Sequence, residues 1–493
     1  MGYRENSLLL KTCRRWPWVG RLVVIATVAL ALLYCPVFCA SQQPAQPSNL
    51  RAQAGSGVAL DSAGLQNQAD PRIADALKQL SPAQIRKTIE KLVSFGNRST
   101  ISPQDEESVK AGKGIGAARE WIKSEFARYS RDCGGCLEVK TDEFLEPPGD
   151  RIKEPTKIAN VYAILRGTDP AQANRIVLVT GHYDSRNSDT FNTTDAAPGA
   201  NDDGSGTAVS LECARVLSRY KFPATIVFLT VAGEEQGLNG SKHFAQMARQ
   251  QNWKLEAVLN NDIVGGDRSP QQDPKVVRVF SEGIPAAASD LEIKRLRALG
   301  GESDSSSREL ARYIVDVGST YEAGVKPLLT FRQDRFLRGG DHYSFNQQGF
   351  AAVRLTEFRE DYNHQHQNVR TQNGIAYGDL PEFVDFDYVA HVARLNAATL
   401  ASLASAPAPP ANVRMLTRNL ENDTTLTWDA SPGATVHEVV WRSTSAPDWQ
   451  NVQAVGNVAR ATIQISKDNV IFAVRAVDAA GHRSLPVVPE PER

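Results

Sequence analysis

Histidine and acidic side chains recur in five short segments in the middle of this chain, each beside glycine or at the end of a strand-like run. The segments are GHYDS around His182, GANDDGSG around Asp202, GEEQGLNGS around Glu234 and Glu235, NNDIVGG around Asp262, and NHQHQN around His364 and His366. Imidazole and carboxylate groups are ligands of Zn²⁺, and two zinc ions together can activate one water for hydrolysis. The residue types therefore predict a site for two zinc ions.

The charges of the candidate ligands suit a zinc pair. Two Zn²⁺ ions bring four positive charges, of which Asp202, Glu235 and Asp262 offset three and a hydroxide offsets the fourth. His182 and His366 complete the ligand set as neutral imidazoles. This balance is typical of a site that activates water.

The segments that carry these residues follow short β-branched runs, which alternate with helical segments after Lys157. The predicted strands are 158–165, 175–181, 224–232, 255–265, 276–280 and 351–357. Such alternation predicts an α/β fold with a mixed, mostly parallel central sheet and helices on both faces. Ligands of such sheets bind at the carboxyl ends of the strands. His182 ends one run, Glu234 and Glu235 follow another, and Asp262 closes a third.

Composition divides the chain into segments of different character. We expect a signal peptide at 1–40, a flexible spacer rich in Gln, Ala, Ser, Gly and Pro at 41–70, and a catalytic domain at 71–404 that begins with helices. SAPAPPA predicts a proline-rich linker at 405–411. Short strands then predict a small all-β sandwich at 412–493, whose TLTW and FAVRAVDAAGHRS motifs resemble a fibronectin type III domain.

The amino terminus indicates export. Lys11, Arg14 and Arg15 precede the apolar run LVVIATVALALLY, which is typical of a secretory signal with cleavage after Ala40. The run is short for a membrane-spanning helix, which needs about 20 residues. The alternative is an uncleaved membrane anchor, and we expect membrane association only in that case. The expected location is secreted or periplasmic. A net charge of -1 gives no field that favours nucleic acid.

Three cysteines follow the signal region. Cys133 and Cys136 form a CGGC motif, which fits a loop-closing disulfide, a redox motif or half of a zinc site. We favour the disulfide because no second CxxC completes a zinc site. Cys213 lies on a helical apolar face and is expected to be a buried free thiol.

Together the five segments resemble the family of double-zinc aminopeptidases, whose relatives include glutamate carboxypeptidases and glutaminyl cyclases. The resemblance covers roughly residues 80 to 405. It implies that His182 and Asp262 hold one zinc ion, that Glu235 and a late histidine hold the other, and that Asp202 bridges the two. The implied cofactor is therefore two Zn²⁺ per chain.

The resemblance also assigns two residues that do not bind zinc. Glu234 is expected to be the general base that takes the proton from the attacking water. Asp184 is expected to orient the imidazole of His182.

The last histidine departs from the family pattern, which shows His-Thr-x-x-Asp-Thr here. Aligning the threonine of NHQHQNVRT selects His366 and puts Arg370 where the acid belongs. Aligning the acid position selects His364, with Asn368 in its place. We favour His366, and either choice leaves the histidine without its usual acidic partner.

Two further motifs allow more than one interpretation. In RGGDHYSF, Asp341 or His342 lines the substrate cleft, or the pair fixes a loop. The RQDR segment, 332–335, contacts a substrate carboxylate or forms a surface ion-pair cluster, and we favour the cluster.

These features predict a zinc exopeptidase that acts on peptides, and the family favours an aminopeptidase. The alternatives within the family are a carboxypeptidase or dipeptidase and, less favoured, a glutaminyl cyclase. The alternative of another class is an inactive binding protein that works through its carboxyl-terminal β domain, which could also contact a cell surface. The presence of Glu234 argues against inactivity.

Overall fold

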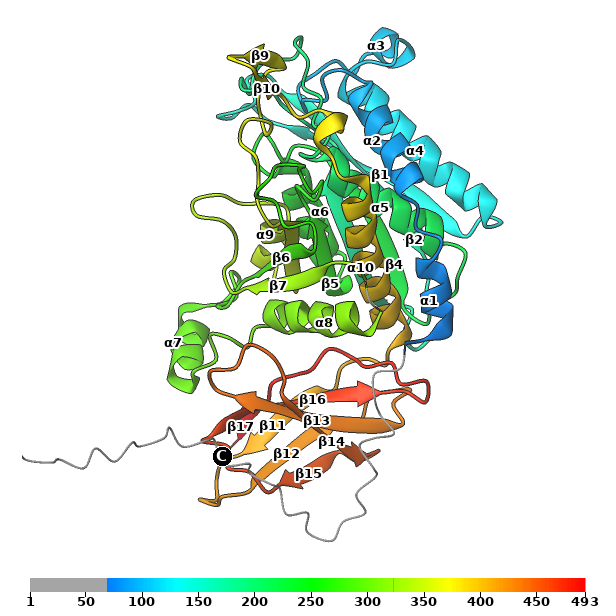
Figure 1. The fold of residues 1–493 in the computed structure, drawn as a ribbon. Helices are drawn as coiled ribbons and strands as arrows, with labels where there is room; N and C mark the ends of the chain where they lie inside the picture. Colours follow the sequence, from blue (N-terminus) through cyan, green and yellow to red (C-terminus); the bar gives the residue numbers. More distant parts are fainter. Residues whose placement is uncertain (1–68, 322, 493) are drawn as a thin grey trace, which may run out of the picture. The chain divides into compact units, whose positions relative to one another are not determined.

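The central sheet of the protein has eight strands in the order β1-β2-β4-β3-β5-β8-β6-β7. It is seen in a computed structural model that describes residues 69–321 and 323–492 (Figure 1). The strands are β1 (Leu137–Glu146), β2 (Thr156–Leu165), β3 (Arg175–His182), β4 (Thr225–Val231), β5 (Lys254–Asn261), β6 (Val276–Ser281), β7 (Lys326–Thr330) and β8 (Ala352–Glu357). All described residues belong to one compact unit, Ala54–Arg493.

The sheet is mixed, with its parallel strands at the centre. β3 pairs in parallel with β4 and β5, and β5 pairs in parallel with β8, whereas β1 and β2 form an antiparallel edge. At the other edge β6 is antiparallel to β8 and parallel to β7. The predicted fold class is therefore confirmed.

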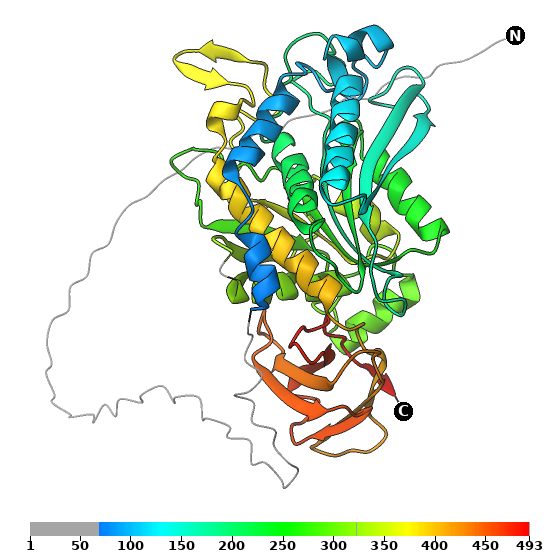
Figure 2. The same ribbon diagram turned by 90° about the vertical axis from the view of Figure 1, so that its right-hand side faces the viewer.

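Helices cover both faces of this sheet. They are α1 (Pro71–Leu77), α2 (Pro82–Val93), α3 (Glu106–Lys110), α4 (Gly114–Asp132), α5 (Gly204–Leu217), α6 (Asn239–Gln250), α7 (Asp290–Leu299), α8 (Ser306–Thr320), α9 (His342–Gln347) and α10 (Phe386–Ser405). Figure 2 shows α1, α2 and α10 side by side on one face. α6 and α9 pack against the opposite face.

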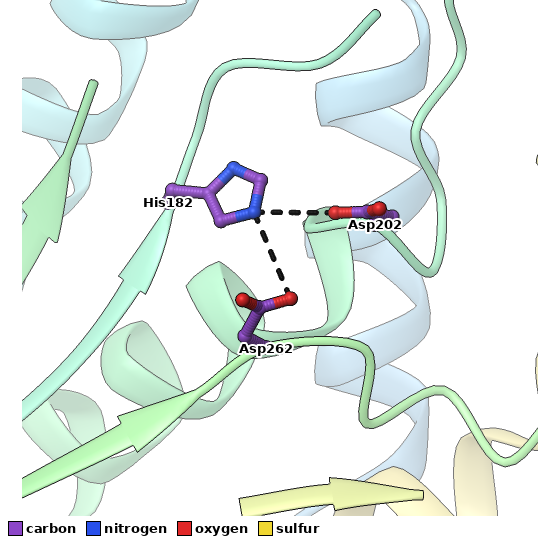
Figure 3. A group of neighbouring side chains, drawn as sticks. All are labelled: His182, Asp202 and Asp262. Atoms are coloured by element: carbon purple, nitrogen blue, oxygen red, sulfur yellow. Dashed lines mark ion pairs between the residues drawn. The ribbon is translucent and has the colours of Figure 1, made fainter. Parts of the chain in front are cut away.

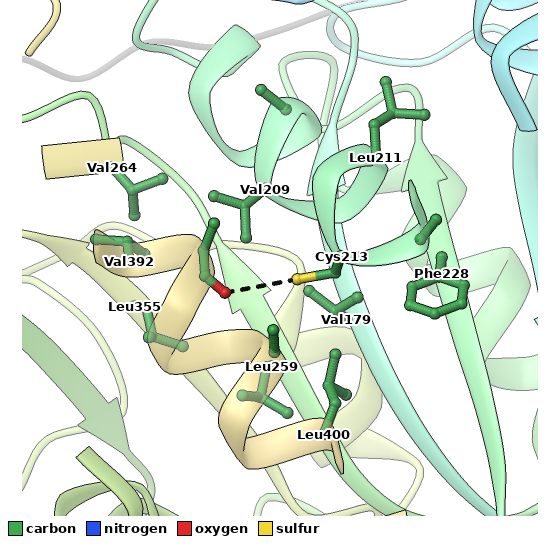
Figure 4. Close-up of a cluster of buried hydrophobic side chains, with 14 of the residues drawn as sticks. Val179, Val209, Leu211, Cys213, Phe228, Leu259, Val264, Leu355, Val392 and Leu400 are labelled. Carbon is green, nitrogen blue, oxygen red and sulfur yellow. Dashed lines mark hydrogen bonds between the residues drawn. The ribbon is translucent and has the colours of Figure 1, made fainter. Parts of the chain in front are cut away.

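The strands are apolar on both sides because both faces are covered. Along β3, Val177 and Val179 join the core beneath α5 and α10, whereas Ile176 and Leu178 join the core beneath α6. This alternation follows from the two-residue repeat of a strand. Figure 4 shows Cys213 within the first core, where its Sγ lies 3.7 Å from the carbonyl oxygen of Ala393. Cys213 is a buried free thiol, as expected.

Beyond α10 the chain forms two further sheets. One has the order β15-β12-β11-β17 and the other β14-β13-β16. The strands are β11 (Ala411–Leu416), β12 (Thr424–Asp429), β13 (Val436–Ser443), β14 (Asn451–Gly456), β15 (Arg460–Ile463), β16 (Val470–Val477) and β17 (Glu490–Glu492). They share one core that includes Trp428, Val439 and Phe472. We call residues 411–492 the β domain; its likeness to fibronectin type III and the domain boundaries stay predictions.

The amino-terminal expectations fall largely outside the described residues. The signal peptide expected at 1–40 and nearly all of the spacer expected at 41–70 lie outside the described residues. Among residues 69–321 and 323–492, no helix has the length and apolar character needed to cross a membrane. Cys133 and Cys136 are joined by a disulfide, which confirms the favoured interpretation of that motif.

Candidate metal centre

Three neighbouring strands bring the acidic and histidine segments to one edge of the sheet. His182 is the last residue of β3, Glu234 and Glu235 follow β4, and Asp262 follows β5. Because β3 pairs in parallel with β4 and β5, the carboxyl ends of all three strands meet. Asp202 reaches the same place from the segment that leads into α5. The crevice at the carboxyl ends of strands is where α/β sheets bind their ligands.

Three buried side chains form the first candidate metal group, His182, Asp202 and Asp262. The Nε2 of His182 lies 3.2 Å from Oδ1 of Asp202 and 3.9 Å from Oδ1 of Asp262 (Figure 3). This Nε2 is buried and has no hydrogen-bond partner among the described residues. A buried polar atom normally has a partner, so an orphaned nitrogen aimed at two carboxylates fits a metal ion.

The second candidate group shares Asp202 with the first and adds Glu235 and His366. The Nε2 of His366 lies 2.9 Å from Oδ2 of Asp202 and 3.0 Å from Oε1 of Glu235. Asp202 therefore turns one oxygen toward each group. This is the arrangement that a carboxylate bridging two metal ions requires.

Asp184 contacts a residue of each candidate metal group. One carboxylate oxygen, Oδ1, lies 3.4 Å from Nδ1 of His182. The other, Oδ2, accepts hydrogen bonds from the Thr100 hydroxyl at 2.8 Å and from the backbone N–H of Glu235 at 3.2 Å. Asp184 is fully buried, so it fixes the backbone that carries Glu235 beside the imidazole of His182.

Glu234 lies in the turn that follows β4. Its carbonyl oxygen accepts hydrogen bonds from the N–H groups of Gly237 and Leu238, at 2.9 and 3.0 Å. Gly233 begins this turn with a φ of 82°, which favours glycine. Burial raises the pKa of the Glu234 carboxyl well above its usual range, although His182 opposes the shift. Burial likewise raises the pKa of the nearby Asp341 carboxyl to about 7.

The structure places His366, and not His364, at the shared carboxylate. His364 turns to Asp267, where its Nδ1 lies 2.5 Å from Oδ2, and its ring stacks on Phe383 with centroids 3.7 Å apart. Among the described residues, His364, Asp267 and Asp361 form a third group whose side chains lie close enough together to hold a metal ion. The hydrogen bond and the stacking account for the position of His364.

The usual acidic partner of the late histidine is replaced by an arginine. Arg186 Nη2 lies 2.6 Å from Nδ1 of His366, and Arg186 Nε donates to Oε2 of Glu235 at 2.9 Å. Asn368, which takes the acid position only in the alignment on His364, accepts hydrogen bonds from the backbone and hydroxyl of Ser188. Arg186 directly follows the GHYDS motif, a signal that sequence reasoning did not use.

A buried arginine supports the first group. Arg354 on β8 is fully buried, and its Nη2 lies 3.0 Å from Oδ1 of Asp262. Its Nη1 lies 3.2 Å from Oδ2 of Asp334 and donates to the Gly339 carbonyl at 3.0 Å. Arg354 thus holds a candidate metal ligand in place.

Asp379 supports the bridging residue. Its two carboxylate oxygens accept the backbone N–H groups of Asn201 and Asp202, at 2.8 and 2.7 Å. Gln365 donates a further hydrogen bond of 2.8 Å to Oδ2 of Asp202. Gln365 lies between the two histidines of the NHQHQN segment, whereas Asp379 belongs to no motif noted in the sequence.

The two ambiguous motifs form a loop beside this centre. Arg335 pairs with Asp334 at 3.1 Å and with Glu360 at 2.7 Å. RQDR therefore takes part in an ion-pair cluster, but the cluster is largely buried and does not lie on the surface as we favoured. The Nε2 of His342 donates to the Gln333 carbonyl at 2.8 Å, so this imidazole fixes the loop.

Known proteins resemble this chain over most of its length. Residues 160–378 match the model of peptidase family M28. A "probable zinc metalloprotease" of Leptosphaeria maculans is 45% identical over 420 residues, which cover 84% of this chain and 96% of that protein. Another, of Pyricularia oryzae, is 46% identical over 434 residues, with coverages of 86% and 85%. The chain therefore belongs to peptidase family M28, as the resemblance indicated.

A solved structure of lower similarity is the LapA aminopeptidase of Legionella pneumophila. It is 22% identical, covers 69% of this chain and 76% of its own, and gives a TM-score of 0.48.

Proposed function

We propose that this protein is a zinc-dependent exopeptidase that binds two zinc ions at the groups joined by Asp202. The main observation behind this proposal is that both groups share Asp202. Its two carboxylate oxygens lie 3.2 Å from His182 and 2.9 Å from His366. The fungal relatives are named as zinc proteases, and imidazole with carboxylate is a ligand set that zinc prefers. His182, Asp202 and Asp262 would hold one ion, and Asp202, Glu235 and His366 the other.

Hydrolysis needs a base beside the attacking water. When bound, a zinc pair supplies Lewis acidity, which polarises the peptide carbonyl and acidifies the water. Glu235 is engaged by Arg186 and His366, whereas Glu234 is the adjacent carboxyl assigned here to proton transfer. Glu234, which is not a proposed ligand, would take the proton of the attacking water.

The charges around the site favour the amino end of a peptide. Arg186 and Arg354 are already paired with Glu235 and Asp262, at 2.9 and 3.0 Å. A substrate α-carboxylate would have to compete for these guanidinium groups. A free α-ammonium could instead pair with Glu234 or Asp341, neighbouring carboxyl groups that are not proposed zinc ligands. We therefore propose aminopeptidase action, with carboxypeptidase or dipeptidase action as the alternative.

A panel of blocked and unblocked peptides tests this proposal. The parent enzyme, loaded with zinc, is expected to cleave a free leucyl peptide and to spare its N-acetylated form. Cleavage of the acetylated peptide together with failure on its C-terminal amide would instead show carboxypeptidase action. Release of pyroglutamate from glutaminyl peptides would show a cyclase, and no turnover of any peptide would favour the binding protein.

We also propose that the protein is exported, from the basic and apolar residues before Ala40. Amino-terminal sequencing of the protein from the growth medium would test both export and cleavage after Ala40. Recovery of an intact amino terminus in the membrane fraction would instead support an uncleaved anchor.

A further inference from the structure

A loop beside the metal centre lines a cavity of about 580 Å³. We call residues 331–339 the cleft loop. Its residues 332–339 line the cavity together with Leu238 and Tyr343. The loop touches the metal centre at its end, because the Gly339 carbonyl accepts a hydrogen bond from Arg354, which also pairs with Asp262. Leu238 belongs to the turn of Glu234. The cavity is therefore lined by residues that neighbour the turn of Glu234 and the pair of Arg354 with Asp262.

The tip of the cleft loop presents apolar surface to solvent. Phe336 is 77% exposed and Leu337 is 106% exposed, which is unusual for two adjacent large apolar residues. Leu337 adopts a φ of 54°, a left-handed conformation at the tip of the turn. An exposed apolar tip beside a hydrolytic site is suited to contact an apolar side chain of a peptide.

The start of the cleft loop is held by two arginines of α8. The guanidinium of Arg308 lies 4.2 Å from the ring centroid of Phe331, and that of Arg312 lies 5.2 Å from it. Cation–π contacts of this length are attractive, and more so when the cation is shielded from water. The side chain of Arg312 is only 2% exposed. The position of Phe331 therefore depends on where Arg312 is held.

Arg312 is held by the β domain. Its Nε donates to the Pro447 carbonyl at 2.6 Å, and it pairs with Glu309 on its own helix. Trp449 Nε1 donates to the other oxygen of Glu309 at 2.9 Å, and the Trp449 ring lies 5.9 Å from the Arg312 guanidinium.

A second buried contact fixes the same surface. Arg442 of the β domain, with a side chain 1% exposed, forms an ion pair with Asp304, just before α8. Removing one partner from such a buried pair is strongly destabilising, so these contacts keep the two surfaces together. The β domain is thus connected to the cleft loop by Trp449, Glu309, Arg312 and Phe331.

We propose, on the basis of the peptidase function above, that the β domain is a positioning element for substrate binding. Trp449 and Arg312 hold Phe331 and thereby keep the apolar tip of the cleft loop against the side chain of the bound peptide. Trp449 is a positioning residue, because it acts through Arg312 and does not touch the metal centre. The β domain therefore shapes the substrate site in addition to any part in attachment.

Trp449→Phe tests the proposal in the full-length protein. The phenyl ring keeps most of the packing but cannot donate to Glu309. The KM for a free leucyl peptide is expected to rise roughly tenfold, as loss of a hydrogen bond to a buried carboxylate allows, while kcat stays within about twofold because the metal ligands are untouched. Amide hydrogen exchange in residues 331–339 is expected to speed up.

Trp428→Phe is the matched control. Trp428 is buried in the β domain core, and its Nε1 has no hydrogen-bond partner within residues 69–321 and 323–492. Its variant is expected to keep the parent KM and the parent exchange rate in residues 331–339. Arg312→Lys provides a second test, because lysine keeps the charge beside Glu309 but loses the planar stacking on Phe331; KM is again expected to rise.

Two results would overturn the proposal. One is a Trp449→Phe variant that exchanges residues 331–339 at the parent rate. The other is an equal rise of KM in Trp449→Phe and Trp428→Phe, which would indicate general loosening of the β domain. The hydrogen-exchange measurement does not require an active enzyme. A parent protein that fails to cleave peptides would therefore refute the proposed function, and hydrogen exchange would still test the positioning role of the β domain.

Discussion

Arg354→Gln is expected to destabilise the metal-free protein more than any change at a surface ion pair. Arg354 is fully buried, and its two ends face Asp262 at 3.0 Å and Asp334 at 3.2 Å. Asp334 keeps Arg335 at 3.1 Å after the change, but Asp262 loses its cationic partner. Breaking a buried ion pair in this way costs about 3–5 kcal/mol, because one charge is left uncompensated.

Urea unfolding after dialysis against a chelator measures this loss. Arg278→Gln is the matched control: Arg278 lies on β6, the strand paired with β8, and its side chain is 20% exposed beside Glu360. Its loss should cost less, because Glu360 keeps Arg335 and Arg338 as partners. Zinc is expected to restore much of the stability of Arg354→Gln, since a cation then faces Asp262 again. The reasoning fails if the two metal-free variants lose equal stability.

Two further predictions concern histidines. His366→Ala is expected to lower the zinc content from about two to about one ion per chain, whereas His364→Ala is expected to retain both ions. Metal analysis after gel filtration distinguishes these outcomes. Equal loss of zinc from the two variants would contradict the assignment of His366. The second concerns His482, whose ring nitrogens lie 2.8 Å from Asp478 and 3.0 Å from Asp70. Burial lowers the pKa of His482, but the two carboxylates raise it by more, so that the net pKa lies above its usual value. Its contribution to stability is therefore fully present below pH ~6.5 and is lost as pH rises through the higher folded pKa. His482→Gln should be less stable than the parent at pH 6 and should approach it in alkaline buffer, and a constant difference in unfolding free energy across this range would contradict the pairing.

The buried strands of the sheet were predictable from sequence because their environment leaves a strong pattern. β3, β4 and β5 are covered on both faces, so they read as continuous β-branched runs. β1 was missed. It is an edge strand with many exposed residues, and its KTDEFLE sequence follows no apolar alternation.

The candidate ligands at the ends of these strands were predictable for the same reason. His182, Glu235 and Asp262 occupy strand ends that the pattern had already located. The choice between His364 and His366 could not be made so firmly, because the two lie in one irregular turn. His366 has a φ of 57°, a backbone conformation that sequence does not reveal for histidine.

The residues that support the ligands could not be predicted, because their partners are distant in sequence. Arg354 is 92 residues from Asp262, and Asp379 is 177 residues from Asp202. Sequence could show only that an arginine interrupts the apolar run AAVRLTE. Such an arginine needs a buried acidic partner, but nothing local identifies which one.

Glu234→Gln tests the central claim most directly. The amide preserves the size of the side chain but cannot accept a proton from water at neutral pH. Glu235→Gln is the contrast, because that neighbour lies 3.0 Å from His366 as a proposed ligand. We expect Glu234→Gln to retain about two zinc ions per chain and to lose about 10²- to 10⁴-fold in kcat on a free leucyl peptide. We expect Glu235→Gln to lose zinc. A Glu234→Gln enzyme that cleaves the peptide at the parent rate with its zinc in place would contradict the account.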